Sequence, residues 1–108
     1  MEHQAEFVIV STTVDSETRA KELATRLVEQ RLAACVHLIP IHSTYRWKGK
    51  IESAAEYLLN AKTRTAIVKE VMDFIRKVHT YEVPEIIVTP ITTGYQEYLS
   101  WVKKETGP

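Results

Sequence analysis

The sequence lacks several features that would assign it to a particular class of protein. Its single cysteine, Cys35, excludes a disulfide within the chain. The 14 lysines and arginines equal the 14 aspartates and glutamates, so no overall field draws the chain to nucleic acid or to an anionic membrane. No apolar run approaches the roughly 20 residues of a membrane span, and residues 1–4 do not resemble a signal peptide. We therefore expect a cytoplasmic protein without nucleic-acid or membrane partners.

Motifs of the common catalytic sites are missing as well. There is no nucleophile elbow, glycine-rich phosphate loop, Cys-x-x-Cys pair or His-Glu-x-x-His helix. Nothing groups a nucleophile with a base and an orienting residue, so the sequence predicts a binding protein rather than an enzyme. Linkers, repeats and low-complexity segments are absent too, and we expect one domain over residues 1–108.

Hydrophobic periodicity predicts elements in the order β-α-β-β-α-β-α. Residues 7–10 form a continuous apolar run rich in β-branched residues, which is typical of a central strand. Apolar stripes at helical spacing predict helices over residues 15–32 and 66–78, and a last helix after Gly94. The first six elements match the split βαβ arrangement, which predicts an α+β, ferredoxin-like fold. The remaining predicted strands cover residues 34–47, 50–63 and 85–91.

The same stripes predict which helical side chains are buried, and Asp15 and Ser16 offer N-cap oxygens for the first helix. The predicted inward residues are Ala20, Leu23, Ala24, Leu27, Val28 and Leu32 in the first helix, Ile67, Val71, Phe74 or Ile75, and Val78 in the second, and Tyr95, Tyr98, Leu99 and Val102 in the last.

A long β-hairpin over residues 34–63 is the most distinctive predicted feature. Lys48 and Gly49 offer a two-residue turn in which Gly49 can adopt a positive φ, and Pro40 predicts a bulge or an edge strand. Each arm of roughly 13 residues would span about 43 Å, whereas a compact chain of this length has a diameter of about 34 Å. The tip should therefore leave its own subunit and pair with another, which predicts a closed oligomer.

The hairpin tip combines aromatic and basic side chains, namely Tyr45, Arg46, Trp47 and Lys48. This composition can stack on nucleotides, but the net charge is zero and the aromatic strand motif of RNA-recognition domains is absent. Tyrosine, tryptophan and arginine are also the usual buried anchors of protein interfaces. We therefore expect the tip to contact another subunit.

Cys35 and His37 lie two residues apart on a predicted strand, so their side chains share one face. A thiolate and an imidazole suit copper or zinc, although a closed metal site needs further ligands. The alternative is that Cys35 is a small buried apolar residue and that His37 is a strand residue with a satisfied hydrogen bond.

His79 ends the second predicted helix and is followed by Tyr81 and Glu82, in a turn stiffened by Pro84. It can act as a C-terminal cap. The presence of tyrosine and glutamate beside it also allows a role as a ligand or proton carrier. Glu56, on the second hairpin arm, can join a site that contains carboxylates.

Several segments resemble the CutA family of divalent-cation tolerance proteins. The similarity covers nearly the whole chain, from Phe7 to Lys104, and its motifs stand in the order of the family. They are RLAACV at 31–36, YRWKGKIE at 45–52, KT at 62–63, HTYEVPEI at 79–86 and YLSW at 98–101. The resemblance implies a homotrimer of ferredoxin-like subunits, similar to the PII signalling proteins, with trimer contacts from the hairpin and from the helix that carries Trp101.

The resemblance also implies a role in tolerance or response to metal ions, with copper binding proposed for the family. The metal ligands would then be Cys35 and His79, with Glu56 or Glu82 as helpers. His37 stands where the family often has asparagine and adds a possible ligand. Two further departures are Thr80, in place of a common proline, and Ser11, where some relatives carry cysteine.

Two alternatives to metal binding stay open. A PII-like sensor would hold a small ligand between subunits, in contact with Tyr57, Lys62 and the turn that contains Tyr81. A scaffold trimer would instead bind another protein through its exposed hairpin tips, including Trp47.

Overall fold

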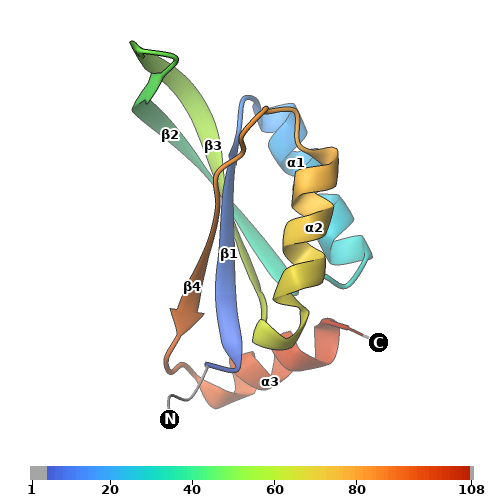
Figure 1. The fold of residues 1–108 in the computed structure, drawn as a ribbon. Helices are drawn as coiled ribbons and strands as arrows, with labels where there is room; N and C mark the ends of the chain where they lie inside the picture. The colour runs from blue at the N-terminus through green and yellow to red at the C-terminus, as the bar shows by residue number, and fades with distance from the viewer. Residues whose placement is uncertain (1–4, 108) are drawn as a thin grey trace.

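A four-stranded sheet with the strand order β2-β3-β1-β4 forms the centre of the computed structural model, which describes residues 5–107 (Figure 1). Every neighbouring pair of strands is antiparallel. This order confirms the predicted α+β, ferredoxin-like fold. The elements are β1 (Phe7–Val14), α1 (Glu17–Glu29), β2 (Cys35–Trp47), β3 (Lys50–Arg64), a 3₁₀ turn (Thr65–Ile67), α2 (Val68–Val78), β4 (Ile86–Ile91) and α3 (Gln96–Glu105).

Helices α1 and α2 cover one face of the sheet (Figure 1). Alternate residues of β1 point to this face, and Val10 is buried there against Leu59, Leu27 and Ile75. The stripe prediction for α2 is confirmed, with Ile75 rather than Phe74 fully buried. Helix α3 packs at the end of the sheet where β1 begins, and its apolar residues form a second, smaller core: Phe7, Ala34, Leu99 and Val102.

The predicted end of the first helix was wrong. Helix α1 begins after Ser16, whose Oγ accepts a hydrogen bond from the Arg19 N–H at 3.2 Å, as expected of an N-cap. It ends at Glu29 instead of residue 32, because Arg31 adopts a left-handed conformation with φ 59°. Val28 was also assigned wrongly, since its side chain is 44% exposed and lies beside the buried stripe.

The other element bounds differ from the predicted ones at their ends. Strand β1 continues to Val14 because residues as far as this one pair with β3. The second helix starts as the 3₁₀ turn and becomes α-helical at Val68. In α3 only Leu99 and Val102 of the predicted stripe are buried, whereas Tyr95 and Tyr98 are exposed.

The hairpin of β2 and β3 projects beyond the rest of the molecule (Figure 1), whose longest dimension is 44 Å. Its register runs without a bulge from Cys35 opposite Lys62 to Trp47 opposite Lys50, so Pro40 marks an edge strand. Lys48 and Gly49 have φ values of 50° and 80°, as a tight two-residue turn requires. Residues 50–56 of β3 lie beyond the last pair with β1.

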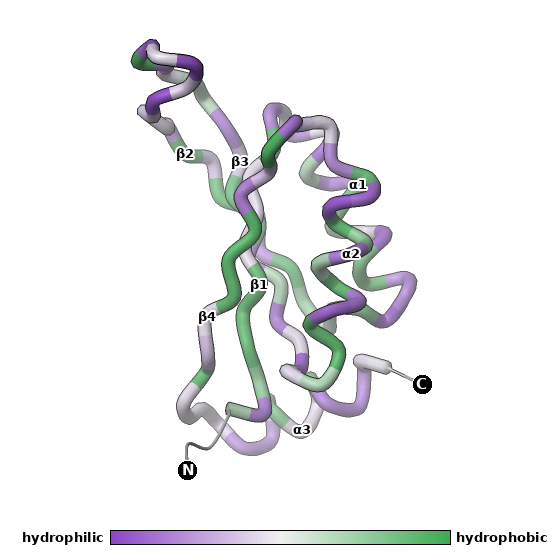
Figure 2. The backbone as a smooth tube through the Cα atoms, viewed as in Figure 1, coloured by the Kyte–Doolittle hydropathy of each residue, from purple (hydrophilic) through white to green (hydrophobic). Residues whose placement is uncertain are grey.

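The face of the sheet opposite α1 and α2 is largely uncovered and carries a patch of apolar residues at its centre. Figure 2 shows α1 and α2 on one side of the sheet only, and no helix lies on the other side over most of the length of β1 and β4. Ile39 and Ile87 are 41% and 52% exposed. By strand register the face also carries Ile9, Ile41 and Leu58. Among the described residues, no helix is long and apolar enough to cross a membrane.

Candidate functional site

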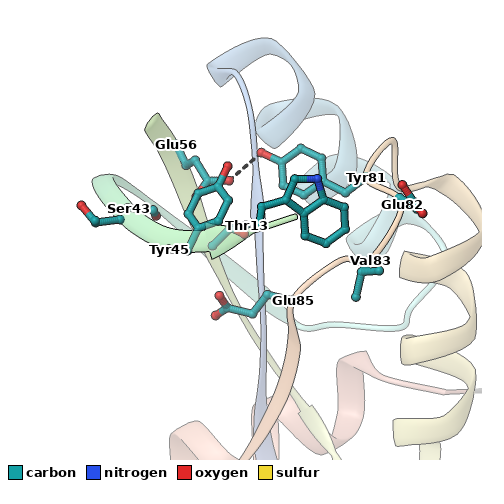
Figure 3. A pocket seen from close by; sticks show the side chains of 10 residues that line it. Thr13, Ser43, Tyr45, Glu56, Tyr81, Glu82, Val83 and Glu85 are labelled. Carbon is teal, nitrogen blue, oxygen red and sulfur yellow. Dashed lines mark hydrogen bonds between the residues drawn. The ribbon is translucent and has the colours of Figure 1, made fainter. Parts of the chain in front are cut away.

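A cavity of about 570 Å³ lies where the projecting half of the hairpin meets the turn between α2 and β4 (Figure 3). Its walls combine aromatic, acidic and small side chains, and none of the lining residues is lysine, arginine or histidine. The aromatic residues are Tyr45, Trp47 and Tyr81, the acidic ones are Glu56, Glu82 and Glu85, and the others are Thr13, Ser43, Thr44 and Val83.

Strand register explains how residues far apart in the sequence reach this cavity. Strand β1 ends with Thr13 and Val14, and β3 continues past it, so Glu56 is the first β3 residue without a β1 partner. Glu56 pairs with Ile41 of β2, and Tyr45 lies four residues further along the same strand. Residues two and four apart on a strand share a face. The side of the hairpin that carries Glu56 therefore also carries Tyr45.

Tyr81 and Glu56 form the central contact of the cavity. The Tyr81 hydroxyl donates a hydrogen bond to Glu56 Oε2 at 2.5 Å, and Glu56 is only 7% exposed (Figure 3). Burial, together with this bond to a carboxylate, raises the pKa of Tyr81 well above its ordinary value. The phenol is therefore held neutral as a donor, and it orients the carboxylate toward the cavity.

His79 joins the end of β1 to the turn that carries Tyr81. Its Nε2 lies 2.8 Å from the Thr13 carbonyl oxygen, and its Nδ1 accepts the Tyr81 backbone N–H at 3.1 Å. This pair of contacts requires the neutral ring with its proton on Nε2. The His79 and Tyr81 rings also pack with centroids 4.7 Å apart. The backbone of His79 caps α2, as expected, but both of its ring nitrogens are engaged in positioning Tyr81.

The structure separates the predicted metal ligands into two groups. Glu56, Glu82 and His79 lie at the cavity end, whereas Cys35 and His37 lie toward the opposite end of β2. Six residues along β2 separate Cys35 from the partner of Glu56, which corresponds to about 20 Å. Within residues 5–107, no three His, Cys, Asp or Glu side chains gather closely enough to hold a metal ion. One chain by itself therefore does not assemble the predicted site.

Cys35 and His37 share the uncovered face, as their spacing predicted, in a basic setting. Lys62 Nζ lies 2.5 Å from His37 Nδ1, and Cys35 pairs with Lys62 across the sheet. Tyr98 of α3 is exposed as a whole, but partial desolvation of its hydroxyl, and then the neighbouring Cys35 thiol, raise the pKa of Tyr98. This end of the sheet thus carries a lysine, Lys62, whereas the opposite end carries the carboxylates of the cavity.

Among the three residues predicted to line a ligand cleft, only Tyr81 lines the cavity. Tyr57 packs against the helix-covered core, and Lys62 lies at the Cys35 end. Sequence reasoning missed Glu85, which had been placed within a strand, although its spacing of three from Glu82 in a rigid turn was a signal for it.

The predicted subunit contacts fall in two places. Tyr45 and Trp47 line the cavity and remain 45% and 38% exposed, and Lys48 Nζ lies 5.7 Å from the centroid of the Trp47 ring. Arg46 is exposed beside them. Trp101 lies on α3, near the opposite end of the sheet, and is 42% exposed. All of these side chains are accessible to a second subunit.

Comparison with known proteins identifies the family. The model of the CutA1 divalent ion tolerance protein family matches residues 8–105. Human protein CutA is 50% identical over 95 residues, which cover 87% of this chain and 53% of that protein, so the chain spans about half the length of that relative.

Two solved structures are also similar. The divalent cation tolerance protein of Thermus thermophilus has a TM-score of 0.90 and 42% identity, covering 94% of this chain and 99% of that one. CutA1 from Oryza sativa has a TM-score of 0.92 and 37% identity, covering 96% of each chain. With its sheet order, its long hairpin and these matches, the chain belongs to the CutA1 family of divalent ion tolerance proteins.

Proposed function

We propose that this protein is a cytoplasmic homotrimer that takes part in the response to divalent metal ions and binds copper, or a similar cation, between its subunits. The observation that carries the proposal is the division of the ligands into two incomplete groups at opposite ends of the sheet. Copper favours imidazole and thiolate ligands, and neither group holds enough of these within one chain. A neighbouring subunit can supply the ligands that each group lacks.

The uncovered face and the projecting hairpin support the trimer. Exposed isoleucines such as Ile39 and Ile87 on an open sheet need cover, and the outer strands β2 and β4 have unpaired edges. A hairpin tip that contacts a different surface of the next subunit makes a heterologous contact, and such contacts form a closed ring when the rotation between neighbouring subunits divides a full turn evenly. A three-membered ring like that of PII proteins would bring the uncovered faces together.

Copper titration of purified protein, combined with its native mass, tests this proposal. The native mass should be three times that of the chain. Cys35→Ala should weaken copper binding by about tenfold or more, which corresponds to at least about 1.4 kcal/mol. His79→Ala should do the same, because in the copper complex His79 Nδ1 would exchange the Tyr81 N–H for the metal ion. His42→Ala is the matched control, because His42 is exposed and contacts Ser53, and by strand alternation it lies on the face of the hairpin opposite to Glu56 and Cys35. Unchanged copper affinity in both ligand variants, or a stable monomer, would contradict the proposal.

A second candidate function is small-ligand sensing, and the cavity favours it. A volume of about 570 Å³ is within the range of about 300–1,000 Å³ that is usual for small-molecule sites. A metabolite that binds the native trimer should raise its melting temperature. A thermal-shift screen separates this function from metal binding, because it can be run in the presence of a chelator.

A further inference from the structure

The turn between α2 and β4, residues 80–85, is held within its own chain through a single residue, Tyr81. The Tyr81 backbone N–H donates to His79 Nδ1 at 3.1 Å, and its hydroxyl donates to Glu56 Oε2 at 2.5 Å (Figure 3). Among residues 5–107, no other hydrogen bond and no ion pair involves residues 80–85. Both contacts of Tyr81 lie inside one chain, so they do not depend on what a neighbouring subunit covers.

The His79 ring is oriented as the rings of metal-binding histidines usually are. Its Nε2–H donates to the Thr13 carbonyl oxygen at 2.8 Å, and Thr13 is fixed within β1 of the sheet. Metal-binding histidines commonly donate one ring N–H to a backbone carbonyl, which fixes the tautomer and leaves the other nitrogen for the metal. In His79 that other nitrogen is Nδ1, so the ring fits the copper, or similar cation, of the proposed function.

The turn and a metal ion compete for this nitrogen. Nδ1 of a neutral histidine with its proton on Nε2 has one lone pair, and the Tyr81 N–H occupies it. A metal ion can bind there only after the Tyr81 backbone has moved away. Glu56, the other group that holds Tyr81, is also one of the proposed metal ligands. The two groups that anchor the turn are therefore the same groups that the ion requires.

We propose that binding of copper, or a similar cation, at His79 Nδ1 displaces Tyr81 and releases the turn of residues 80–85. Tyr81 is then a competitor of the metal ion, and the turn is the part of the chain whose conformation reports that the ion is bound. This deepens the proposed function, because it rests on His79 as a metal ligand and identifies the first structural change in the response to the ion.

Copper titration of Tyr81→Phe tests the competition. The variant keeps the backbone N–H and lacks the hydroxyl that anchors the turn on Glu56, so the turn is displaced more easily. We expect copper to bind at least about threefold more tightly than to the unmodified protein. Tyr95→Phe is the matched control and should leave the affinity unchanged, since the exposed Tyr95 donates to Glu97 at 2.8 Å outside the cavity. Unchanged or weaker binding by Tyr81→Phe, as expected of a residue that supports the metal site, would overturn the proposal.

Hydrogen exchange, measured by mass spectrometry on the native protein, reports on the turn itself. The peptide that contains the Tyr81 amide should take up deuterium faster with saturating copper than without it, because the amide loses its acceptor. A peptide from α3, near the opposite end of the sheet, should exchange equally in both conditions. His79→Ala lacks both the acceptor and the ligand, so its turn should exchange rapidly with and without copper.

The outcomes separate this proposal from the metal proposal. Copper binding that leaves exchange in the turn unchanged would overturn the release of the turn and leave the metal proposal standing, whereas absence of copper binding would overturn both. Faster exchange over the whole chain, α3 included, would indicate unfolding or dissociation and would also overturn the release of the turn. Should His79→Ala fail to fold, exchange in the unmodified protein and the sign of the Tyr81→Phe effect still decide the outcome.

Discussion

The two ends of the sheet differ in how far their charged side chains are hydrogen-bonded within the protein. Where β1 begins, the protein itself satisfies its arginines. Arg64 donates hydrogen bonds to Thr106 Oγ1 at 2.9 Å and to the Thr106 carbonyl at 3.0 Å. Arg31 donates to the carbonyl oxygens of Lys104 at 2.7 Å and Gly107 at 2.9 Å. Guanidinium groups at a helix C-terminus interact favourably with its last carbonyls. Arg64 thus holds the end of α3 against β3, and Arg31 holds it against the turn that follows α1.

Where β1 ends, the carboxylates of the cavity have few hydrogen-bond or ion-pair partners among the described residues. Glu56 is bound only by the Tyr81 hydroxyl among the described residues, and Glu82 and Glu85 take part in none of the ion pairs found there. A charge whose partners are all internal contributes to stability. A buried charge whose partners are incomplete costs stability and is available to a ligand. The comparison thus indicates that the charged residues where β1 begins stabilise the fold, and that those where β1 ends are available for binding.

Loss of the Arg64 side chain should have the largest effect on stability. Arg64→Ala removes two hydrogen bonds from a charged donor and leaves polar atoms of the buried Thr106 without these partners. We expect the free energy of unfolding to fall by about 3 kcal/mol. Urea unfolding at a fixed protein concentration measures this. Arg76→Ala, at an exposed position of α2, is the control and should change stability by less than about 0.5 kcal/mol.

Thr106→Val should have an intermediate effect. The substitution keeps the shape of the side chain and removes the hydroxyl that accepts from Arg64 Nε and donates to the Val102 carbonyl at 2.8 Å. Arg64 keeps its bond to the Thr106 carbonyl. A loss of about 1–2 kcal/mol is expected in the same urea experiment. A loss as large as that of Arg64→Ala would show that the hydroxyl, rather than the carbonyl, dominates the contact.

At the cavity end, Glu56→Gln should behave differently from the arginine variants. The amide oxygen can still accept the Tyr81 hydroxyl, and the desolvation cost of a buried charge disappears. Stability should rise, or stay within about 0.5 kcal/mol of the unmodified protein. A fall of more than about 2 kcal/mol would mean that Glu56 is as structural as Arg64, and the contrast between the two ends would be lost.

The smallest expected effect is that of Tyr81→Phe on the free energy of unfolding at alkaline pH. The pKa of Tyr81 is raised in the folded protein, so above the ordinary tyrosine pKa the unfolded chain loses this proton while the folded protein keeps it. The contribution of Tyr81 to the free energy of unfolding is complete below the ordinary tyrosine pKa. It is lost as the pH rises through the raised pKa of the folded protein. Tyr81→Phe should therefore flatten part of the decline in stability above about pH 10. Identical stability profiles for the two proteins between pH 9 and pH 12 would show that Tyr81 does not contribute.

The local pattern of the sequence predicted most of the fold. Periodicity located each helix and strand, and the Lys48-Gly49 pair located the hairpin turn. Errors occurred where backbone conformation or packing decides, as with Arg31, whose left-handed conformation ends α1 early, and Tyr98, which is 39% exposed rather than buried. The site was predicted only in part. Glu56 and Glu82 were named, but as metal ligands together with Cys35, which lies toward the other end of β2. Tyr81 was named as part of a ligand cleft with Tyr57 and Lys62, which do not line the cavity.

What the sequence by itself determined is the set and order of the elements, because apolar spacing, caps and turn residues act over a few neighbouring positions. Only the tertiary structure decided which charges meet a partner. Glu56 meets Tyr81 across 25 residues of sequence, and Arg64 meets Thr106 across 42. Such contacts depend on the register of β3 against β1 and on the packing of the turn and of α3. A shift of one residue in that register would turn Glu56 to the opposite face of the sheet.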